Sequence, residues 1–254
     1  MKSDARAEIA LRHRGTSVRL PVLYEDREVL VIDKPPGWML APADWKSTRR
    51  NLLAALLEGV EAGAWWARSR GLRFLRPVHR LDTDTSGVLL LAKSPRSLEI
   101  FSKFFAQHRM GKTYWALSRN RPAREEWVAR EALAEGLDRE GRIRVDPRRG
   151  RSAETAFRVL AREQGLSWIL CQPLTGRTHQ IRVHLAHAGC PILGDVLYGG
   201  EASPARGWPL ALRAVELVWE ERPGRSRRVE APGGGFLSAF YGGHPPVPEE
   251  AGTG

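Results

Sequence analysis

The length of the apolar runs is the feature that most limits what this chain can fold into. VLLLA at 88–92 and the run within LSWILCQPL at 166–174 have the length of strands that are covered on both faces. No run approaches the roughly 18 apolar residues that a membrane-spanning helix needs. Such strands outnumber the helical patterns and do not strictly alternate with them. The chain is therefore predicted to be α+β, with a mixed and largely antiparallel central sheet flanked by helices and loops.

Helix starts and ends are predicted from capping residues. Ser94 and Pro95 suit an N-cap and a first-turn proline, and Gly111 suits the end of that helix. The two other helices are expected over 51–60, capped by Ser47 or Thr48, and over 178–189, capped by Thr178 and closed by Gly189.

Shifts in composition divide the 254 residues into three parts. Residues 1–20 are basic and weakly patterned, which indicates an N-terminal arm or a first edge strand. Residues 21–232 hold the strong strand and helix patterns and form the main domain, in one piece or as two packed halves. Residues 233–254 are rich in Pro and Gly and are expected to form a disordered tail.

The positive charge is unusual for a soluble enzyme. The chain carries 34 Arg and 6 Lys against 29 acidic residues, a formal net charge of +11. Because the guanidinium fork suits phosphate and stacks on bases, an anionic polymer is an expected partner, although a GC-rich genome would also enrich arginine. Cys171 and Cys190 lack metal or disulfide spacing, and the N-terminus lacks a secretory signal, so a cytoplasmic location is expected.

Two carboxylates in the segment HRLDTDTSG raise the question of a site. Asp82 and Asp84 lie directly before an apolar strand, and Asp, Thr, Ser and Gly all suit a tight turn. A paired-carboxylate glycosidase needs its two acids on opposite sides of a sugar, which residues two apart in a turn do not favour. A metal-dependent nuclease would need histidine ligands as well. Helical spacing puts His184 and His187 on one face but turns His179 well away from His184.

A third hypothesis joins Asp82 to the segment LTGRTHQIR. Arg177 stands there at the start of a helix, after another buried strand. If the two strands are neighbours, its guanidinium lies close to Asp82 and keeps that carboxylate ionised in a dry pocket, as a nucleophile or anionic stabiliser requires. Tyr114, on a strand with Ala116, could line the same pocket with a flat ring. A buried ion pair that only holds two halves together would give the same pairing.

Three segments in this order resemble the pseudouridine synthases of the RluA type: HRLDTDTSG, GKTYWAL and LTGRTHQIRVHLAHAGCPILGDVLYGG. The flanking segments VLYEDREVLVIDKPPGWMLAP and GRSAETAFRVL are similar to the same family, so the likeness covers about Val22 to Trp219. It implies the pseudouridine synthase fold, with an active-site cleft between two halves and 21–232 as the catalytic domain. It also implies an isomerase that flips uridine out of structured RNA and converts it to pseudouridine without a cofactor.

The resemblance assigns roles by matched position. Asp82 corresponds to the catalytic aspartate of the family, and Asp84 falls at an open position. Tyr114 matches the tyrosine that stacks on the target base and is a candidate for proton transfer at C5, and Arg177 matches the basic residue that pairs with the aspartate. Whether Asp82 attacks the sugar, attacks the base or assists sugar deprotonation is left open.

The remaining site residues implied by the resemblance contact RNA or shape the pocket. Arg80 matches an arginine that fills the space left by the flipped nucleotide, and His79 beside it is expected to contact RNA. The pocket is expected to be formed by Leu81, Thr85, Ser86, Gly87, His179 and Gln180.

Two departures from the family pattern are visible. Many relatives begin with a small RNA-binding domain of the S4 type, for which residues 1–20 are too short, so RNA capture is expected to fall on the catalytic domain. Arg213 stands where relatives usually carry histidine and is expected to be peripheral. The candidate RNA-binding surface is an Arg-rich segment, which would also suit a solvated loop, and its arginines are Arg142, Arg144, Arg148, Arg149 and Arg151.

The expected partner is ribosomal or transfer RNA, bound by a monomer with no metal and no membrane. A catalytically idle RNA-binding factor that uses the same cleft is the alternative of a different class, and the presence of Asp82, Tyr114 and Arg177 argues against it.

Overall fold

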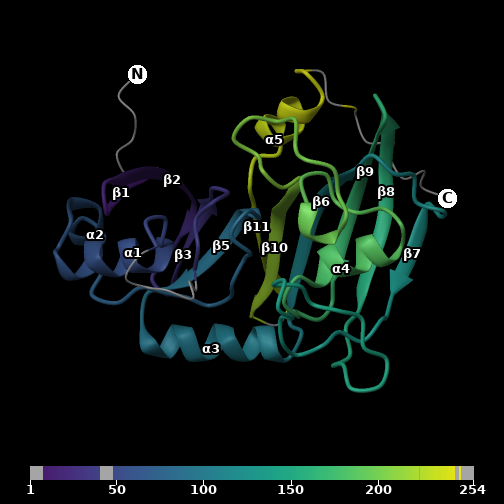
Figure 1. Cartoon of the computed structure of the whole chain (residues 1–254). Coiled ribbons are helices and arrows are strands. Elements are labelled where there is room, and N and C mark those ends of the chain that lie inside the picture. The colour runs from purple at the N-terminus through teal and green to yellow at the C-terminus, as the bar shows by residue number, and fades with distance from the viewer. Residues whose placement is uncertain (1–7, 41–47, 223, 244–245, 247–254) are drawn as a thin grey trace. The chain divides into compact units, whose positions relative to one another are not determined.

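The computed structural model describes residues 8–40, 48–222, 224–243 and 246, and the chain forms two compact units (Figure 1). Unit 1 consists of residues 1–110 and 216–231, and unit 2 consists of residues 111–215 and 232–254. The chain therefore passes from one unit to the other three times, at 110/111, at 215/216 within a strand, and at 231/232.

The first four long strands of unit 1 form an antiparallel sheet in the order β1, β2, β3 and β5. Their bounds are Glu8–His13 for β1, Thr16–Glu25 for β2, Val29–Lys34 for β3 and Ser86–Ala92 for β5. The short β4, Arg76–Pro77, pairs with β5, and β11, Arg225–Glu230, pairs with residues 216–222 of β10, Leu212–Arg222. Residues 8–13 thus form an edge strand, one of the two forms expected for the N-terminal part.

The described residues of unit 1 form three helices: α1, Leu52–Glu61; α2, Trp65–Arg68; and α3, Pro95–Ala106. Leu89 and Leu91 of β5 lie in a buried cluster with residues of β1 and α1, whereas Val88 and Leu90 lie in a second cluster with Phe101 of α3. Successive strand residues point to opposite faces, so β5 is covered on both sides. The buried strand predicted at 88–92 is confirmed.

Local capping rules succeed at one helix and fail at another. Ser94 caps α3 in a reciprocal pair with Ser97, and Pro95 occupies the first turn, as predicted. The predicted end at Gly111 is wrong, because α3 ends at Ala106 and Gly111 already lies in β6.

The start of α1 also differs from the prediction. Asn51 is the N-cap, and its side chain accepts a hydrogen bond from the N–H of Ala54 at 3.0 Å. Of the two caps that were predicted, Thr48 lies three residues too early, and Ser47 lies outside the described residues.

An antiparallel sheet in the order β6, β9, β8 and β7 forms the body of unit 2, and α4 lies over one face of it (Figure 1). The strands are β6, Met110–Ser118; β7, Glu126–Ala129; β8, Thr155–Glu163; and β9, Leu166–Pro173. The helices are α4, Gln180–His187; the 3-10 helix η1, Val196–Tyr198; and α5, Gly234–Phe240. Ile181 and Leu185 of α4 are buried in the same cluster as Leu117 and Ile169 of the sheet.

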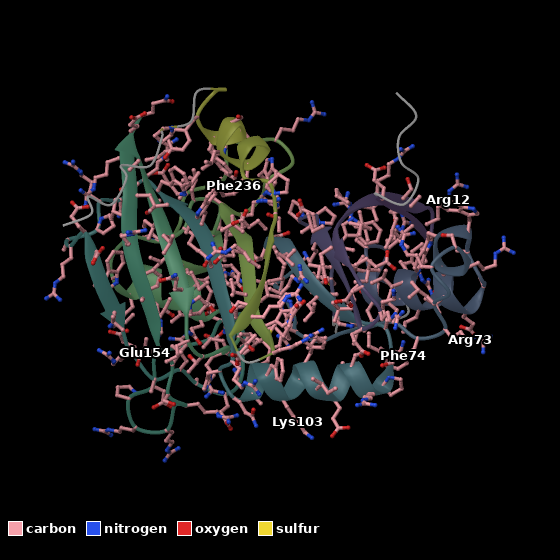
Figure 2. The ribbon with its side chains drawn as sticks, turned by 180° about the vertical axis from the view of Figure 1, so that it is seen from behind. Arg12, Arg73, Phe74, Lys103, Glu154 and Phe236 are labelled. Atoms are coloured by element: carbon pink, nitrogen blue, oxygen red, sulfur yellow. The ribbon has the colours of Figure 1, made fainter. Side chains whose placement is uncertain are left out.

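Part of the expected C-terminal tail is folded. Phe236 of α5, labelled in Figure 2, is fully buried. The ring of Trp208 meets it edge-on at a centroid distance of 5.3 Å. Most residues after 243 lie outside the described part of the chain.

Strands dominate both units and helices are few, so the predicted α+β class is confirmed. Within the described ranges, no helix combines the length and the apolar character that crossing a membrane requires.

Candidate active site

The Asp82 turn lies between β4 and β5 in unit 1, and the side chain of Lys34 holds its backbone. Lys34 is the last residue of β3 and is fully buried. Its Nζ donates to the carbonyl oxygens of Thr83 and Thr85, both at 2.8 Å, and to that of Pro35 at 3.0 Å. Three acceptors match the three protons of an ammonium group, so the turn is fixed by a cation.

Charge links Lys34 to both carboxylates of the turn. Burial lowers the pKa of Lys34 to about 7, and the negative charges of Asp84 and Asp82 oppose this shift. Lys34 was not predicted from the sequence. The available signal was a lysine that ends the apolar strand VLVIDK directly before two prolines.

The residues on both sides of Asp82 are packed into unit 1. The predicted pocket residues Leu81, Thr85 and Ser86 are buried. Gly87 has a φ of +109°, which favours glycine, at the start of β5. These residues therefore fix the backbone on both sides of Asp82.

His79 is engaged inside unit 1. Its ring stacks on Phe105 at a centroid distance of 4.7 Å, and its Nε2 accepts a hydrogen bond from the N–H of Leu90 at 3.1 Å. These contacts give His79 a part in holding β5. Arg80, next to it, is exposed, and its contact with RNA stays a prediction.

Tyr114 lies on β6 in unit 2, opposite Cys171 of β9. Its ring is half-buried and packs against the main core cluster of this unit. Lys112 stands two residues earlier on the same strand and therefore on the same face. The Nζ of Lys112 donates to the carbonyl oxygen of Thr175 at 2.9 Å, and burial lowers the pKa of Lys112 to about 8.

Arg177 lies in the loop between β9 and α4, and the Gln180 side chain fixes the backbone of this loop. Gln180 Oε1 accepts hydrogen bonds from the N–H of Arg177 at 2.9 Å and from the hydroxyl of Thr175 at 2.7 Å. The Nε of Arg177 donates to the carbonyl oxygen of Ser152 at 3.0 Å. The neutral Gln180 side chain thus ties the loop that carries the guanidinium to α4, in addition to the bond from Lys112 to Thr175.

The start of α4 corrects the predicted cap. His179, not Thr178, occupies the N-cap position, with a left-handed φ of 55° and no capping bond from its side chain. Its Nδ1 is hydrogen-bonded to the hydroxyl of Tyr198 at 2.8 Å, and that hydroxyl accepts from the N–H of Ile143 at 2.7 Å. Because the Gln180 side chain binds the loop backbone, the Thr178 hydroxyl is not needed as a cap.

A buried series of hydrogen bonds continues from Gln180. Its Nε2 donates to the carbonyl oxygen of Glu154 and to Thr155 Oγ1, both at 2.9 Å. Thr155 Oγ1 lies 3.0 Å from His184 Nδ1, and His184 Nε2 lies 3.1 Å from the carbonyl oxygen of Glu131. A carbonyl only accepts, so Nε2 carries the proton and Nδ1 can accept from the hydroxyl. Burial lowers the pKa of His184, which favours this neutral form.

These contacts bear on the metal-dependent nuclease. Both ring nitrogens of His184 are occupied by Thr155 and Glu131, and His179 Nδ1 is occupied by Tyr198. In the part of the chain that the structure describes, no three His, Cys, Asp or Glu side chains are grouped to hold a metal ion. The nuclease alternative therefore has no ligand set among these residues.

Acidic neighbours engage three of the five arginines expected to bind RNA in the segment 142–151. The ion pairs are Arg142–Asp138 at 3.3 Å, Arg144–Asp138 at 2.8 Å and Arg151–Glu135 at 3.2 Å. Arg148 and Arg149 are exposed. The segment thus offers less free positive charge than its composition suggests.

Arg213 is not peripheral in position. It is buried, with 3% of its surface exposed, and its Nε and Nη2 donate to the carbonyl oxygen of Pro232 at 3.1 and 2.8 Å. Its guanidinium also lies over the ring of Trp208, 5.6 Å from the centroid. Arg213 therefore anchors the chain within unit 2 where α5 begins.

The two units carry different parts of the predicted site. Asp82 belongs to unit 1, and Tyr114 and Arg177 belong to unit 2. Within each unit the structure brings an anchor to a predicted residue: Lys34 to the Asp82 turn, and Gln180 to the Arg177 loop. The pairing of Asp82 with Arg177 stays a prediction.

Residues 28–187, more than half of the chain, match the family model described as RNA pseudouridylate synthase. The chain is 37% identical over 181 residues to an uncharacterized RNA pseudouridine synthase of Zymomonas mobilis, which covers 70% of this chain and 78% of that protein. It is also 37% identical over 180 residues to the ribosomal large subunit pseudouridine synthase C of Escherichia coli, which covers 70% of this chain and 53% of that protein. The solved structure of human RNA pseudouridylate synthase domain containing 4 has the same fold, with a TM-score of 0.71 at 22% identity, over 90% of this chain and 94% of that one.

The chain therefore belongs to the RNA pseudouridylate synthase family. Within that family it is of the RluA type, and it is an isomerase that acts on uridine in RNA. The matched region spans about half the length of the Escherichia coli enzyme, so the particular RNA of that enzyme is not assigned to this chain.

Proposed function

We propose that this chain converts uridine to pseudouridine in a structured ribosomal or transfer RNA, with Asp82 as the catalytic carboxylate. The observation that carries the assignment is the Asp82 turn, whose backbone is fixed by hydrogen bonds from the buried Lys34. A fixed turn holds the carboxylate in one place, as a catalytic group requires. The sequence alone supports a monomer that works in the cytoplasm without metal or cofactor.

The reaction rearranges one nucleotide. The bond between ribose C1′ and uracil N1 breaks, the detached base turns, and C1′ joins C5. The proton leaves C5 and N1 ends protonated, so atoms and electrons balance without an oxidant or reductant. The ionised Asp82 serves the step at the sugar or the base, and Arg177 keeps it ionised.

Tyr114 is assigned to the base. Taking a uridine out of its stack costs a few kcal/mol, and stacking on an aromatic ring returns about 1–3 kcal/mol. The half-buried Tyr114 ring, held by β6, suits this stacking and the transfer of the C5 proton. Arg80 would take the place of the flipped nucleotide.

The test compares two substitutions in the same turn. RNA labelled with tritium at uridine C5 releases the label when pseudouridine forms, and the release is measured for Asp82→Asn and for Asp84→Asn. Asp82→Asn is expected to lose about a thousandfold or more in rate and to bind the RNA within about threefold of the wild type. Asp84→Asn removes the same charge two residues away and is expected to keep most of the rate. Turnover by Asp82→Asn at the wild-type rate would remove Asp82 from the catalytic role.

A further inference from the structure

We propose that the β1–β2 hairpin and the loop before α1 form a binding surface for the phosphate backbone of the RNA. This hairpin surface consists of Arg12, Arg14, Arg49 and Arg50. It deepens the proposed function and rests on it, because the RNA substrate is the polyanion that it would hold. All four side chains are exposed, and none has an ion pair within the described residues.

The two basic segments of the hairpin surface are tied to each other. Arg14 and Gly15, with φ of 46° and 77°, form the tight turn between β1 and β2. Thr16 is the first residue after this turn, and its hydroxyl lies within hydrogen-bond distance of two carbonyl oxygens, that of His13 at 2.6 Å and that of Arg49 at 3.0 Å. The spacing between the arginines of the turn and those of the loop is therefore set by the fold.

Arg50 connects the hairpin surface to the Asp82 turn. Its guanidinium packs over Gly37, where an added Cβ would lie 3.1 Å from Arg50 Nη1. The N–H of Gly37 donates to the carbonyl oxygen of Thr83 at 2.9 Å, and Lys34 donates to the same oxygen. A phosphate held by Arg50 would thus lie on the segment that supports Asp82.

A groove of about 600 Å³ runs beside the hairpin. Arg12, Ser17 and Arg19 line its polar side, and small residues of α1 together with Trp66 line its apolar side. Its volume lies within the range of small-ligand sites, so it admits a nucleotide of a bound strand. Polar and basic groups on one side and apolar groups on the other suit a phosphate and a base.

The charge balance of this region is positive. Among the described residues, the contacts place two carboxylates here: Glu58, which lines the groove and is bonded to His13 Nδ1 at 2.8 Å, and Glu8, which lies 3.5 Å from Arg19. They stand against five arginines, the four of the hairpin surface and Arg19. In the segment 142–151, by contrast, acids engage most of the arginines. The hairpin surface is therefore the better match for a phosphate backbone.

The test removes two charges from the hairpin surface and two from elsewhere in unit 1. Arg12→Gln with Arg50→Gln is compared with Arg73→Gln with Arg96→Gln, since Arg73 and Arg96 are also exposed and have no ion pair among the described residues. Figure 2 labels Arg12 on the hairpin and Arg73 apart from it. The probe is a fluorescein-labelled RNA stem-loop with an oligouridine loop, titrated at several salt concentrations.

The hairpin double variant is expected to bind about tenfold more weakly at physiological salt. Each phosphate contact contributes about 0.7 to the slope of log affinity against log salt for single-stranded RNA, so the slope should fall by about 1.4. In tritium release the KM for RNA should rise. The control double variant should keep the wild-type slope and KM. An unchanged slope in the hairpin variant, or an equal loss in the control, would overturn the proposal.

Two further measurements show whether weaker binding comes from loss of folding or from the catalytic assignment. Arg14→Glu changes an exposed turn residue, so it should preserve the thermal unfolding midpoint and still weaken binding; wild-type binding by this variant would also overturn the proposal. The binding titration needs no turnover. If Asp82→Asn retained full activity, the catalytic assignment would fail while the salt slope would still decide the hairpin surface.

Discussion

The Asp82 turn and the Arg177 loop are both fixed through their backbones, but by groups of different charge. The turn that carries a carboxylate is held by Lys34, a buried cation with three carbonyl acceptors. The loop that carries a guanidinium is held by Gln180, a neutral side chain at the centre of a buried network. Each anchor suits the charge that it supports, because a cation favours an ionised acid and a neutral amide places no like charge beside an arginine.

Lys112 is the exception that tests this pattern. Its Nζ reaches the Arg177 loop through the carbonyl oxygen of Thr175. Burial lowers the pKa of Lys112 to about 8. Burial lowers the pKa of Lys34 further, to about 7, although Asp84 and Asp82 oppose this shift. Lys112 is therefore a true exception, because a lysine that keeps its proton to a higher pH than Lys34 also binds the Arg177 loop.

The largest effect is expected from Lys34→Met. The change leaves three carbonyl oxygens without their donor and removes the cation from the carboxylate turn, so the free energy of unfolding should fall by about 3 kcal/mol or more. Tritium release per folded molecule should fall as well, because the turn that holds Asp82 is no longer fixed. Denaturant unfolding and the tritium assay measure the two effects.

Lys93→Met is the matched control in the same unit. Lys93 Nζ also makes short hydrogen bonds, to Glu25 Oε1 at 2.9 Å and to the carbonyl oxygen of Asp26 at 2.7 Å, but it does not touch the Asp82 turn. It is expected to lose stability with little change in tritium release. If Lys34→Met stayed within about 1 kcal/mol of the wild type and kept its rate, Lys34 would not be the anchor of the turn.

A smaller loss is expected from Gln180→Leu. The change removes four hydrogen bonds, two to the Arg177 loop and two to Glu154 and Thr155, but uncovers no charge, so the free energy of unfolding should fall by about 2 kcal/mol. Gln172→Leu, at an exposed position of β9, is the control and should stay near the wild type. A loss from Gln180→Leu as large as that from Lys34→Met would show that the neutral and the charged anchor do not differ in strength.

The fold was predictable where the signal is local. Strand-length apolar runs placed β5 and β9, and Ser94 with Pro95 placed the start of α3, because these patterns act within a few residues. The end of α3 was not predictable from Gly111, since the left-handed His108 turns the chain earlier.

The site was predictable only in its motif residues. Asp82, Tyr114 and Arg177 come from segments with a recognisable order. Lys34 binds Thr83 and Thr85 across 49 and 51 residues, and no pattern in one sequence shows such a contact. The role of Thr155 in the Gln180 network is hidden for the same reason, because it depends on how β8 packs against α4.

The smallest expected effect is a difference in the pH dependence of stability between the Gln180 network, which contains His184, and the Lys34 anchor. Burial lowers the pKa of His184 in the folded chain, so the unfolded chain takes up a proton first as the pH falls. The contribution of the neutral His184 to stability is therefore complete above its ordinary pKa of 6.5 and declines below it. The pKa of Lys34 falls from 10.5 to about 7 on folding, so between these pH values the unfolded chain holds a proton that the folded chain has lost, and the free energy of unfolding rises with pH. Below about pH 7 Lys34 is protonated in both states and adds no slope.

His184→Asn keeps a polar group that can bond to Thr155 and removes the titration. Between pH 7 and pH 5 its free energy of unfolding should fall less steeply than that of the wild type, by at most about 1.4 kcal/mol per pH unit for one proton. Lys34→Met should keep the wild-type slope in this acid range and differ from it only above pH 7. If the free energy of unfolding had the same slope against pH in His184→Asn and in the wild type, the Gln180 network would not depend on the protonation of His184. The two anchors would then not differ in acid.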